Sequence, residues 1–186
     1  MNAHLPRALA FGAEYPLPVT DITASSPNAL AYRVAMRKLA GAVSLLTLGE
    51  GVERMGVRVT SVSPLGSEPP MLLVVVRRET PVSAHLHQKG AFAINVLRAR
   101  HEALATRFAD AEEADTPGLS TPAAWTRLET GAPVLADALV SFDCDLDEVI
   151  SRRDHLMVLG RVVATRITEG DVPLLHWAGA YRQVAT

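Results

Sequence analysis

The pattern that most constrains the fold lies at residues 141–149, where apolar and acidic side chains alternate. A period of two places the two sets on opposite sides of an extended chain, whereas a helix repeats every 3.6 residues. This segment is therefore predicted to be a strand with one buried and one solvent-facing side. The apolar set is Phe142, Cys144 and Leu146, and the acidic set is Asp143, Asp145 and Asp147.

Strand signals recur along the chain, and helical spacing is confined to three segments. With so few helices, and without the βα alternation of a parallel sheet, the pattern predicts a mainly β protein built on a closed antiparallel sheet. The apolar run at 71–76 predicts a strand buried on both faces. The prolines and glycine between Pro64 and Pro70 predict a loop, as does the acidic stretch 109–124. The predicted strands are 42–48, 56–62, 71–76, 91–97, 141–149, 156–165 and 174–184, and the predicted helices are 29–40, 81–88 and 101–108.

The length of 186 residues suits one domain, predicted over 28–186, with Asn28 as the first helix cap. Residues 1–27 contain four prolines and little periodicity, which predicts an irregular N-terminal arm. The net charge of -2, without a basic run, argues against nucleic-acid binding. The longest N-terminal apolar stretch, Ala8–Ala13, is too short for a signal peptide or membrane span, so we expect a cytoplasmic protein.

No catalytic dyad or metal motif is evident in the sequence. There is no Gly-x-Ser-x-Gly elbow, and His85 and His87 are two residues apart on a predicted helix, which points them in different directions. Cys144, the single cysteine, lies on the predicted buried face and is expected to be a structural thiol. We therefore expect no metal site. The missing dyad is informative only if the chemistry belongs to a bound cofactor, and hydride transfer from a nicotinamide to a flavin is one such case.

Five segments in order resemble the short-chain flavin reductases, which have the FMN-binding split-barrel fold and serve as reductase components of two-component flavin-dependent monooxygenases. The resemblance covers the chain from about residue 30 to its C-terminus. The segments are Tyr32–Val43, Met55–Val62, Ser67–Val74, Phe92–Leu97 with Glu102–Ala109, and Asp154–His155 with Pro173–Tyr181.

The resemblance implies an antiparallel split barrel, a homodimer, and the cofactors FMN or FAD and NADH or NADPH. It places the isoalloxazine over one strand and the flavin phosphate beside the next strand and helix, and it makes His155 the residue near the nicotinamide. The implied flavin-strand residues are Val57, Arg58, Val59, Thr60 and Ser61, and the phosphate residues are Arg77, Thr80 and Ser83. Asn95 and the Phe108–Asp110 turn would close that side, and Tyr181 would shape the pocket.

The chain departs from the family pattern at several positions. Arg58 stands where the family usually has threonine, Arg153 replaces a glycine, and Pro64 and Gly66 interrupt a serine-rich stretch. The main hypothesis is an NAD(P)H:flavin oxidoreductase that passes hydride from nicotinamide C4 to flavin N5 and supplies reduced flavin to a monooxygenase. Two alternatives stay open: a non-catalytic flavin- or haem-binding sensor or carrier, and a flavin-dependent biosynthetic enzyme on the same scaffold.

Overall fold

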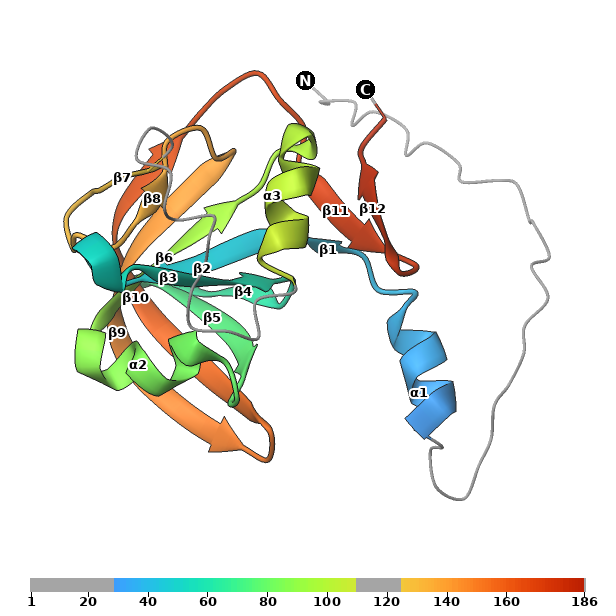
Figure 1. Ribbon diagram of the computed structural model, residues 1–186, viewed down its shortest axis with the longest axis horizontal. Coiled ribbons are helices and arrows are strands. Elements are labelled where there is room, and N and C mark those ends of the chain that lie inside the picture. Colours follow the sequence, from blue (N-terminus) through green and yellow to red (C-terminus); the bar gives the residue numbers. More distant parts are fainter. Residues whose placement is uncertain (1–28, 110–124, 186) are drawn as a thin grey trace, which may run out of the picture.

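The computed structural model describes residues 29–109 and 125–185 (Figure 1). The predicted arm 1–27, the Asn28 cap and most of the predicted loop 109–124 lie outside the described residues. The helices are α1 (Ala29–Met36), α2 (Pro81–Lys89) and α3 (Glu102–Arg107), with short 3-10 turns η1 (Gly51–Glu53) and η2 (Ala99–His101). The strands are β1 (Gly41–Ala42), β2 (Ser44–Leu48), β3 (Met55–Val59), β4 (Val62–Ser67), β5 (Pro70–Arg77), β6 (Ala91–Val96), β7 (Trp125–Thr126), β8 (Val134–Leu135), β9 (Val140–Arg152), β10 (His155–Ile167), β11 (Leu174–Trp177) and β12 (Ala180–Gln183).

The main layer is a seven-stranded sheet in the order β3-β2-β6-β9-β10-β5-β4, with every neighbouring pair antiparallel. A smaller sheet, β1-β11-β12, and a two-residue pair, β7-β8, stand beside it. The predicted mainly β, antiparallel class is confirmed. No helix in the described ranges is long and apolar enough to cross a bilayer.

The two ends of the seven-stranded sheet meet, although no hydrogen-bonded pair joins β3 to β4 in the part described. Only Thr60 and Ser61 separate the end of β3 from the start of β4, so the sheet must curl until its edges are adjacent. The Val75 N–H donates to the Ser61 carbonyl oxygen at 3.1 Å, which ties this connection to β5. The sequence prediction of a closed sheet is not confirmed, because no hydrogen-bonded pair among the described residues closes the curled sheet.

The main hydrophobic core lies inside this curl and draws on β2, β3, β5, β6, β9 and β10, with α2 covering one end. Phe92 and Ile94 of β6 are fully buried, as are Val74 of β5 and Val158 of β10. The Phe92 ring needs a glycine opposite it, because a Cβ at Gly160 would lie 2.4 Å from the ring carbon Cζ. The β9–β10 register shifts at this position, where Asp147 of β9 is the extra residue opposite the Leu159–Gly160 step.

Two strand predictions were wrong in detail. The segment predicted as a loop contains the edge strand β4, whose residues 63–67 are exposed and whose Pro64 sits beside a bulge. An edge strand tolerates proline because one side of its backbone has no sheet partner. β5 is not buried on both faces: Leu72, Val74 and Val76 face the core, while the residues between them are half-buried.

The acidic side of β9 is also not uniformly exposed. Asp143 is fully buried, and its carboxylate accepts hydrogen bonds from the Thr130 backbone N–H at 2.8 Å and from the Thr130 hydroxyl at 2.5 Å. The segment that leads into β8 covers this part of the sheet and provides those donors. A buried carboxylate is tolerated where fixed donors replace water.

Helix α1 is shorter than predicted and stands away from the sheets in Figure 1. None of its eight residues is buried. The segment after it is held to the C-terminal hairpin, since the Ala178 N–H donates to the Arg37 carbonyl oxygen at 3.0 Å and the Trp177 indole N–H donates to the Lys38 carbonyl oxygen at 3.2 Å.

Candidate functional site

A pocket of about 560 Å³ opens where the ends of the seven-stranded sheet meet. Its volume lies in the range of small-molecule sites. Nine of the twelve predicted site residues line it, from β3, the β3–β4 connection, the end of β5, the start of α2, the end of α3 and the start of β10. These nine are Val57, Arg58, Val59, Thr60, Ser61, Arg77, Thr80, Phe108 and His155.

The free edge of β3 forms one wall of the pocket. β3 pairs with β2 on one side, and on the other side the Arg58 N–H donates to the Phe108 carbonyl oxygen at 3.4 Å. A Cβ at Gly56 would lie 2.8 Å from a Phe108 ring carbon, so the glycine lets the end of α3 lie against the strand. Thr60 and Ser61 continue this wall as exposed hydroxyl residues. The wall therefore offers backbone polar groups and hydroxyls at the edge of a sheet.

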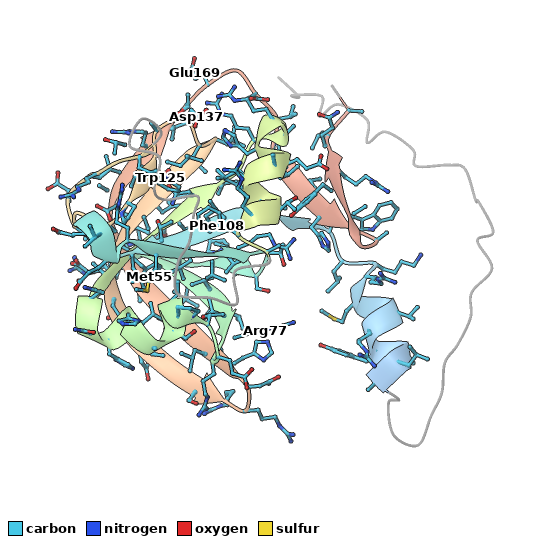
Figure 2. The ribbon with its side chains drawn as sticks, viewed as in Figure 1. Met55, Arg77, Phe108, Trp125, Asp137 and Glu169 are labelled. Atoms are coloured by element: carbon cyan, nitrogen blue, oxygen red, sulfur yellow. The ribbon has the colours of Figure 1, made fainter. Side chains whose placement is uncertain are left out.

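The end of β5 and the start of α2 provide groups suited to an anion. Thr80 caps α2, since its hydroxyl oxygen accepts from the Ser83 N–H at 3.3 Å. The Ser83 hydroxyl donates to the Arg77 carbonyl oxygen at 2.6 Å and lies 2.8 Å from the Thr80 hydroxyl. Ser83 is buried and does not line the pocket, so it positions Thr80 and the backbone of Arg77. The exposed Arg77 side chain (Figure 2) and a helix N-terminus are a recurrent phosphate-binding combination.

His155 begins β10 and lies opposite Arg77 in the β5–β10 register. Its imidazole side chain is 44% exposed, and Nδ1 lies 2.9 Å from an Asp154 carboxylate oxygen. The hydrogen bond from His155 is the largest of the causes that lower the pKa of Asp154. The carboxylate orients the ring through Nδ1 and leaves Nε2 available to a ligand.

Arg58 and Tyr181 meet across the gap between the two sheets. The Arg58 guanidinium donates from Nη1 to the Tyr181 hydroxyl at 3.0 Å and lies 5.9 Å from the ring centroid. The Tyr181 ring also packs edge-on against His176. Burial, followed by the nearby Arg58 and Arg37 cations, lowers the pKa of His176. Tyr181 does not line the pocket, so it acts on the pocket by holding Arg58.

Asn95 does not line the pocket, and the structure gives its predicted binding role no support. It is fully buried in β6, and its side chain bonds to the Leu135 N–H, the Ser141 hydroxyl, the Thr47 hydroxyl and the Leu45 carbonyl. With both ends of the amide engaged inside the protein, Asn95 has no capacity left for a ligand.

The pocket also has wall residues that sequence reasoning missed: Val75, Val76 and Glu79. Glu79 is the carboxylate among the lining residues, and its position between Arg78 and the predicted phosphate residue Thr80 was the available signal. Val76 does face the core, and Val75 was assigned to the core because half-burial on the second face of β5 is invisible in an apolar run.

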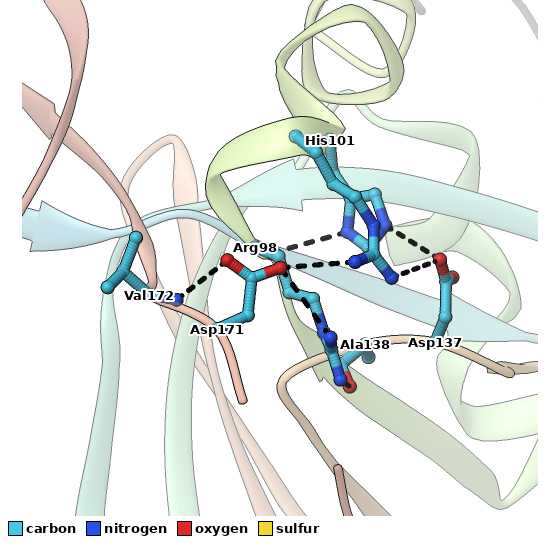
Figure 3. A network of polar contacts seen from close by, with 7 residues as sticks. Arg98, His101, Asp137, Ala138, Asp171 and Val172 are labelled. Atoms are coloured by element: carbon cyan, nitrogen blue, oxygen red, sulfur yellow. Dashed lines mark hydrogen bonds and ion pairs between the residues drawn. The ribbon is translucent and has the colours of Figure 1, made fainter. Parts of the chain in front are cut away.

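A second polar cluster lies elsewhere, around the buried Arg98 (Figure 3). Arg98 and Arg100 contact Asp171 at 3.5 and 3.1 Å, and Arg100 also contacts Asp137 at 2.8 Å. The His101 Nδ1 accepts from the Arg98 N–H at 3.3 Å while Nε2 faces Asp137 at 3.2 Å. These contacts join the chain after β6 to the segments before β9 and β11, which is a structural role. Across the described ranges, no group of three or more His, Cys, Asp or Glu side chains could hold a metal ion.

The fold and the pocket define a class: an antiparallel β protein whose curled sheet presents a strand edge, hydroxyls, a guanidinium and a helix N-terminus to one ligand. This donor set fits a flavin, because the isoalloxazine rim carries donors and acceptors that pair with backbone groups, and its phosphate suits the Arg77–Thr80 end.

Comparison with known proteins specifies that class. Residues 36–185 match the family described as flavin reductase like domain, and the chain belongs to that family. The FMN reductase (NADH) RutF of Agrobacterium fabrum is 38% identical over 158 residues, covering 83% of this chain and 88% of the relative. RutF 2 of Methylorubrum extorquens is 39% identical over 159 residues, covering 83% and 89%.

Solved structures agree with the sequence relatives. The NADH:FAD oxidoreductase SgcE6 of Streptomyces globisporus superposes with a TM-score of 0.81 at 25% identity, covering 91% of this chain and 100% of that chain. BorF, the flavin reductase component of a bacterial two-component tryptophan halogenase, superposes with a TM-score of 0.77 at 25% identity, covering 86% and 99%.

Proposed function

We propose that this protein is an NADH-dependent flavin reductase that supplies reduced flavin to a partner monooxygenase. One observation carries the proposal: the sheet curls so that the β3 edge, the Arg77–Thr80 corner and His155 line a single pocket. Relatives named FMN reductase (NADH), with 38% and 39% identity, support the same reaction.

The bound flavin supplies the acceptor for a hydride, which leaves nicotinamide C4 and arrives at flavin N5. The protein's own contribution is to bind and orient the two partners. The backbone of β3 and the hydroxyls of Thr60 and Ser61 bind the flavin ring. Arg77 and Thr80 bind its phosphate, and Ser83 holds Thr80 in place. His155, oriented by Asp154, is proposed to contact the nicotinamide through Nε2.

We propose the split-barrel form of the family and a homodimer. Helix α1 supports the dimer, because an isolated helix this short is marginal in water without packing. None of its residues is buried, and Tyr32, Val34 and Met36 are 59%, 50% and 42% exposed. Sedimentation velocity tests the dimer: a monomer at micromolar concentration contradicts it. A cytoplasmic location stays a prediction from the sequence.

The decisive experiment combines spectroscopy with kinetics on the purified protein. FMN and FAD are each titrated by quenching of flavin fluorescence, and NADH and NADPH oxidation is then followed with each flavin. We expect NADH oxidation that depends on added flavin. Absence of turnover with every flavin–nicotinamide pair refutes the proposal, and tight flavin retention without NADH oxidation favours a sensor or carrier.

His155 is tested within the same assay. His155→Ala is expected to reduce kcat at saturating FMN, whereas His87→Ala, which alters an exposed histidine of α2 that does not line the pocket, serves as the matched control. An equal kcat in wild type and His155→Ala would refute the proposed role of His155 at the nicotinamide.

A further inference from the structure

The turn between β9 and β10 places positive charge at the mouth of the pocket. Arg152 lies opposite His155 in the β9–β10 register, and His155 lies opposite Arg77 in the β5–β10 register. Directly opposite residues of antiparallel strands project from the same face with Cβ atoms about 5 Å apart. Arg77, His155 and Arg152 therefore form one row across three strands, with Arg77 and His155 already lining the pocket.

Arg153 extends this row into the turn itself. It is the first of the two residues between the paired Arg152 and His155, and its φ of 52° lies in the left-handed region. Glycine is favoured at such a position, and another residue costs of the order of 1 kcal/mol there. Within the described part of the chain, the Arg153 side chain makes no hydrogen bond or ion pair that offsets that cost. Contacts within the described part of the chain therefore do not explain why this turn position is an arginine.

The charge at this turn is only partly offset by carboxylates, since Asp154 interacts electrostatically with Arg77 and is hydrogen-bonded to His155. No ion pair among the described residues involves Arg152, Arg153 or Arg77, whereas Arg98, Arg100, Arg127 and Arg161 each pair with an acid. The acid of the turn, Asp154, is bound to His155, and Glu79 lies inside the pocket. The Arg78 side chain donates to the Ser151 hydroxyl at the base of the turn. The turn is thus cationic, although the whole chain has a net charge of -2.

We propose that Arg152 and Arg153, here called the cationic rim, bind the diphosphate of the nicotinamide dinucleotide. The inference rests on the proposed function, which brings the nicotinamide ring to the flavin beside His155. A dinucleotide with its nicotinamide at His155 carries its diphosphate outward along the same strand row. Guanidinium groups are the side chains best matched to phosphate oxygens, and the rim lies next in that row.

The test is the double variant Arg152→Ala/Arg153→Gly. Arg152 is exposed, and the glycine removes the charge of Arg153 while relieving the left-handed strain, so the variant is expected to fold and to melt no lower than wild type. The matched control is Arg182→Ala, which removes an exposed arginine of β12 that does not line the pocket.

Loss of two exposed ion contacts predicts a KM for NADH about 2- to 20-fold higher in the double variant at low ionic strength. The Kd for NAD⁺ on the flavin-loaded protein, read from flavin fluorescence, is expected to rise in parallel, and added salt is expected to narrow the difference from wild type. The values of kcat and of the Kd for FMN are expected to stay within two-fold. With the phosphate-free hydride donor 1-benzyl-1,4-dihydronicotinamide, double variant and wild type are expected to be equal.

The outcomes separate this inference from the proposed function. Suppose that the wild-type protein oxidises NADH and that the KM and NAD⁺ affinity of the double variant lie within two-fold of wild type. That result refutes diphosphate binding by the cationic rim and leaves the proposed function standing. An equal rise in KM with NADH and with the phosphate-free donor also refutes diphosphate binding by the cationic rim, because the defect would then not involve the diphosphate. A wild-type protein inactive with every flavin refutes the proposed function itself.

Discussion

Replacement of Asn95 by alanine tests whether this residue stabilises the fold or binds the flavin. The Asn95 amide oxygen accepts from the Leu135 N–H at 2.8 Å and from the Ser141 hydroxyl at 2.9 Å, and its amide nitrogen donates to the Thr47 hydroxyl at 3.0 Å. Asn95 and Ser141 are 0% and 1% exposed, so water does not reach these groups readily.

The magnitude follows from the donors that Asn95→Ala leaves without an acceptor. A buried donor that loses its partner costs about 1–3 kcal/mol, and this variant orphans two, so unfolding should become easier by roughly 2–6 kcal/mol. Ser141→Ala is the matched control: it removes one donor and leaves the other bonds of Asn95 in place, at a cost of about 1 kcal/mol. The double variant is expected to lose less than the sum of the two, since Ser141→Ala deletes one of the groups that Asn95→Ala orphans.

The measurement is urea unfolding followed by far-ultraviolet circular dichroism, with FMN affinity determined under conditions where each variant is folded. We expect a large stability loss for Asn95→Ala and an FMN affinity within about two-fold of wild type. A stability loss below about 1 kcal/mol, accompanied by a clear loss of FMN affinity, would refute this reasoning and return Asn95 to the flavin site.

Three further predictions concern a core contact, a histidine and the thiol. Gly160→Ala should destabilise the fold by about 1–3 kcal/mol because its Cβ would lie 2.4 Å from the Phe92 ring; an unchanged melting temperature contradicts this. Arg58→Thr should raise the lowered pKa of His176 part of the way towards 6.5, as judged by NMR titration, because one repelling cation is removed while burial, the largest cause, stays. The pKa of His176 is lower in the folded than in the unfolded protein, so the free energy of unfolding falls as the pH drops through about 6.5. Arg58→Thr should weaken this pH dependence. An unchanged His176 titration would be evidence against the electrostatic interaction between Arg58 and His176. Burial raises the pKa of Cys144 to about 12, so the native thiol should resist thiol reagents at about pH 8 and react after unfolding.

Local patterning predicted most elements well but missed features that depend on a distant partner. The period-two alternation located β9 and its buried Cys144, since alternation reports directly which side of a strand faces the core. The same rule failed at Asp143, because the donors that bury it come from Thr130, outside the strand. β4 was missed because an exposed edge strand has no buried face and so no alternation.

The candidate site shows the same division. Resemblance supplied its residue types, and the structure brought nine of them to one pocket. Asn95 and Tyr181 could not be assigned from the sequence. Each is a polar residue in an ordinary strand, and its partners, Leu135 and Arg58, are 40 and 123 residues away along the chain.

The sequence by itself determined a mainly β chain with few helices, a buried lone thiol, and no evident catalytic dyad. The expectation of a flavin, and the residues proposed to bind it, came from the resemblance to a family. Only the tertiary structure decided that β3 meets the end of β5 and the start of β10, that Asn95 belongs to the interior, and that Arg152 continues the row of Arg77 and His155. The physical reason is that periodicity reflects the geometry of one short segment. Strand order and register are set by burial and hydrogen bonds between segments far apart in the chain, and that pairing places side chains together.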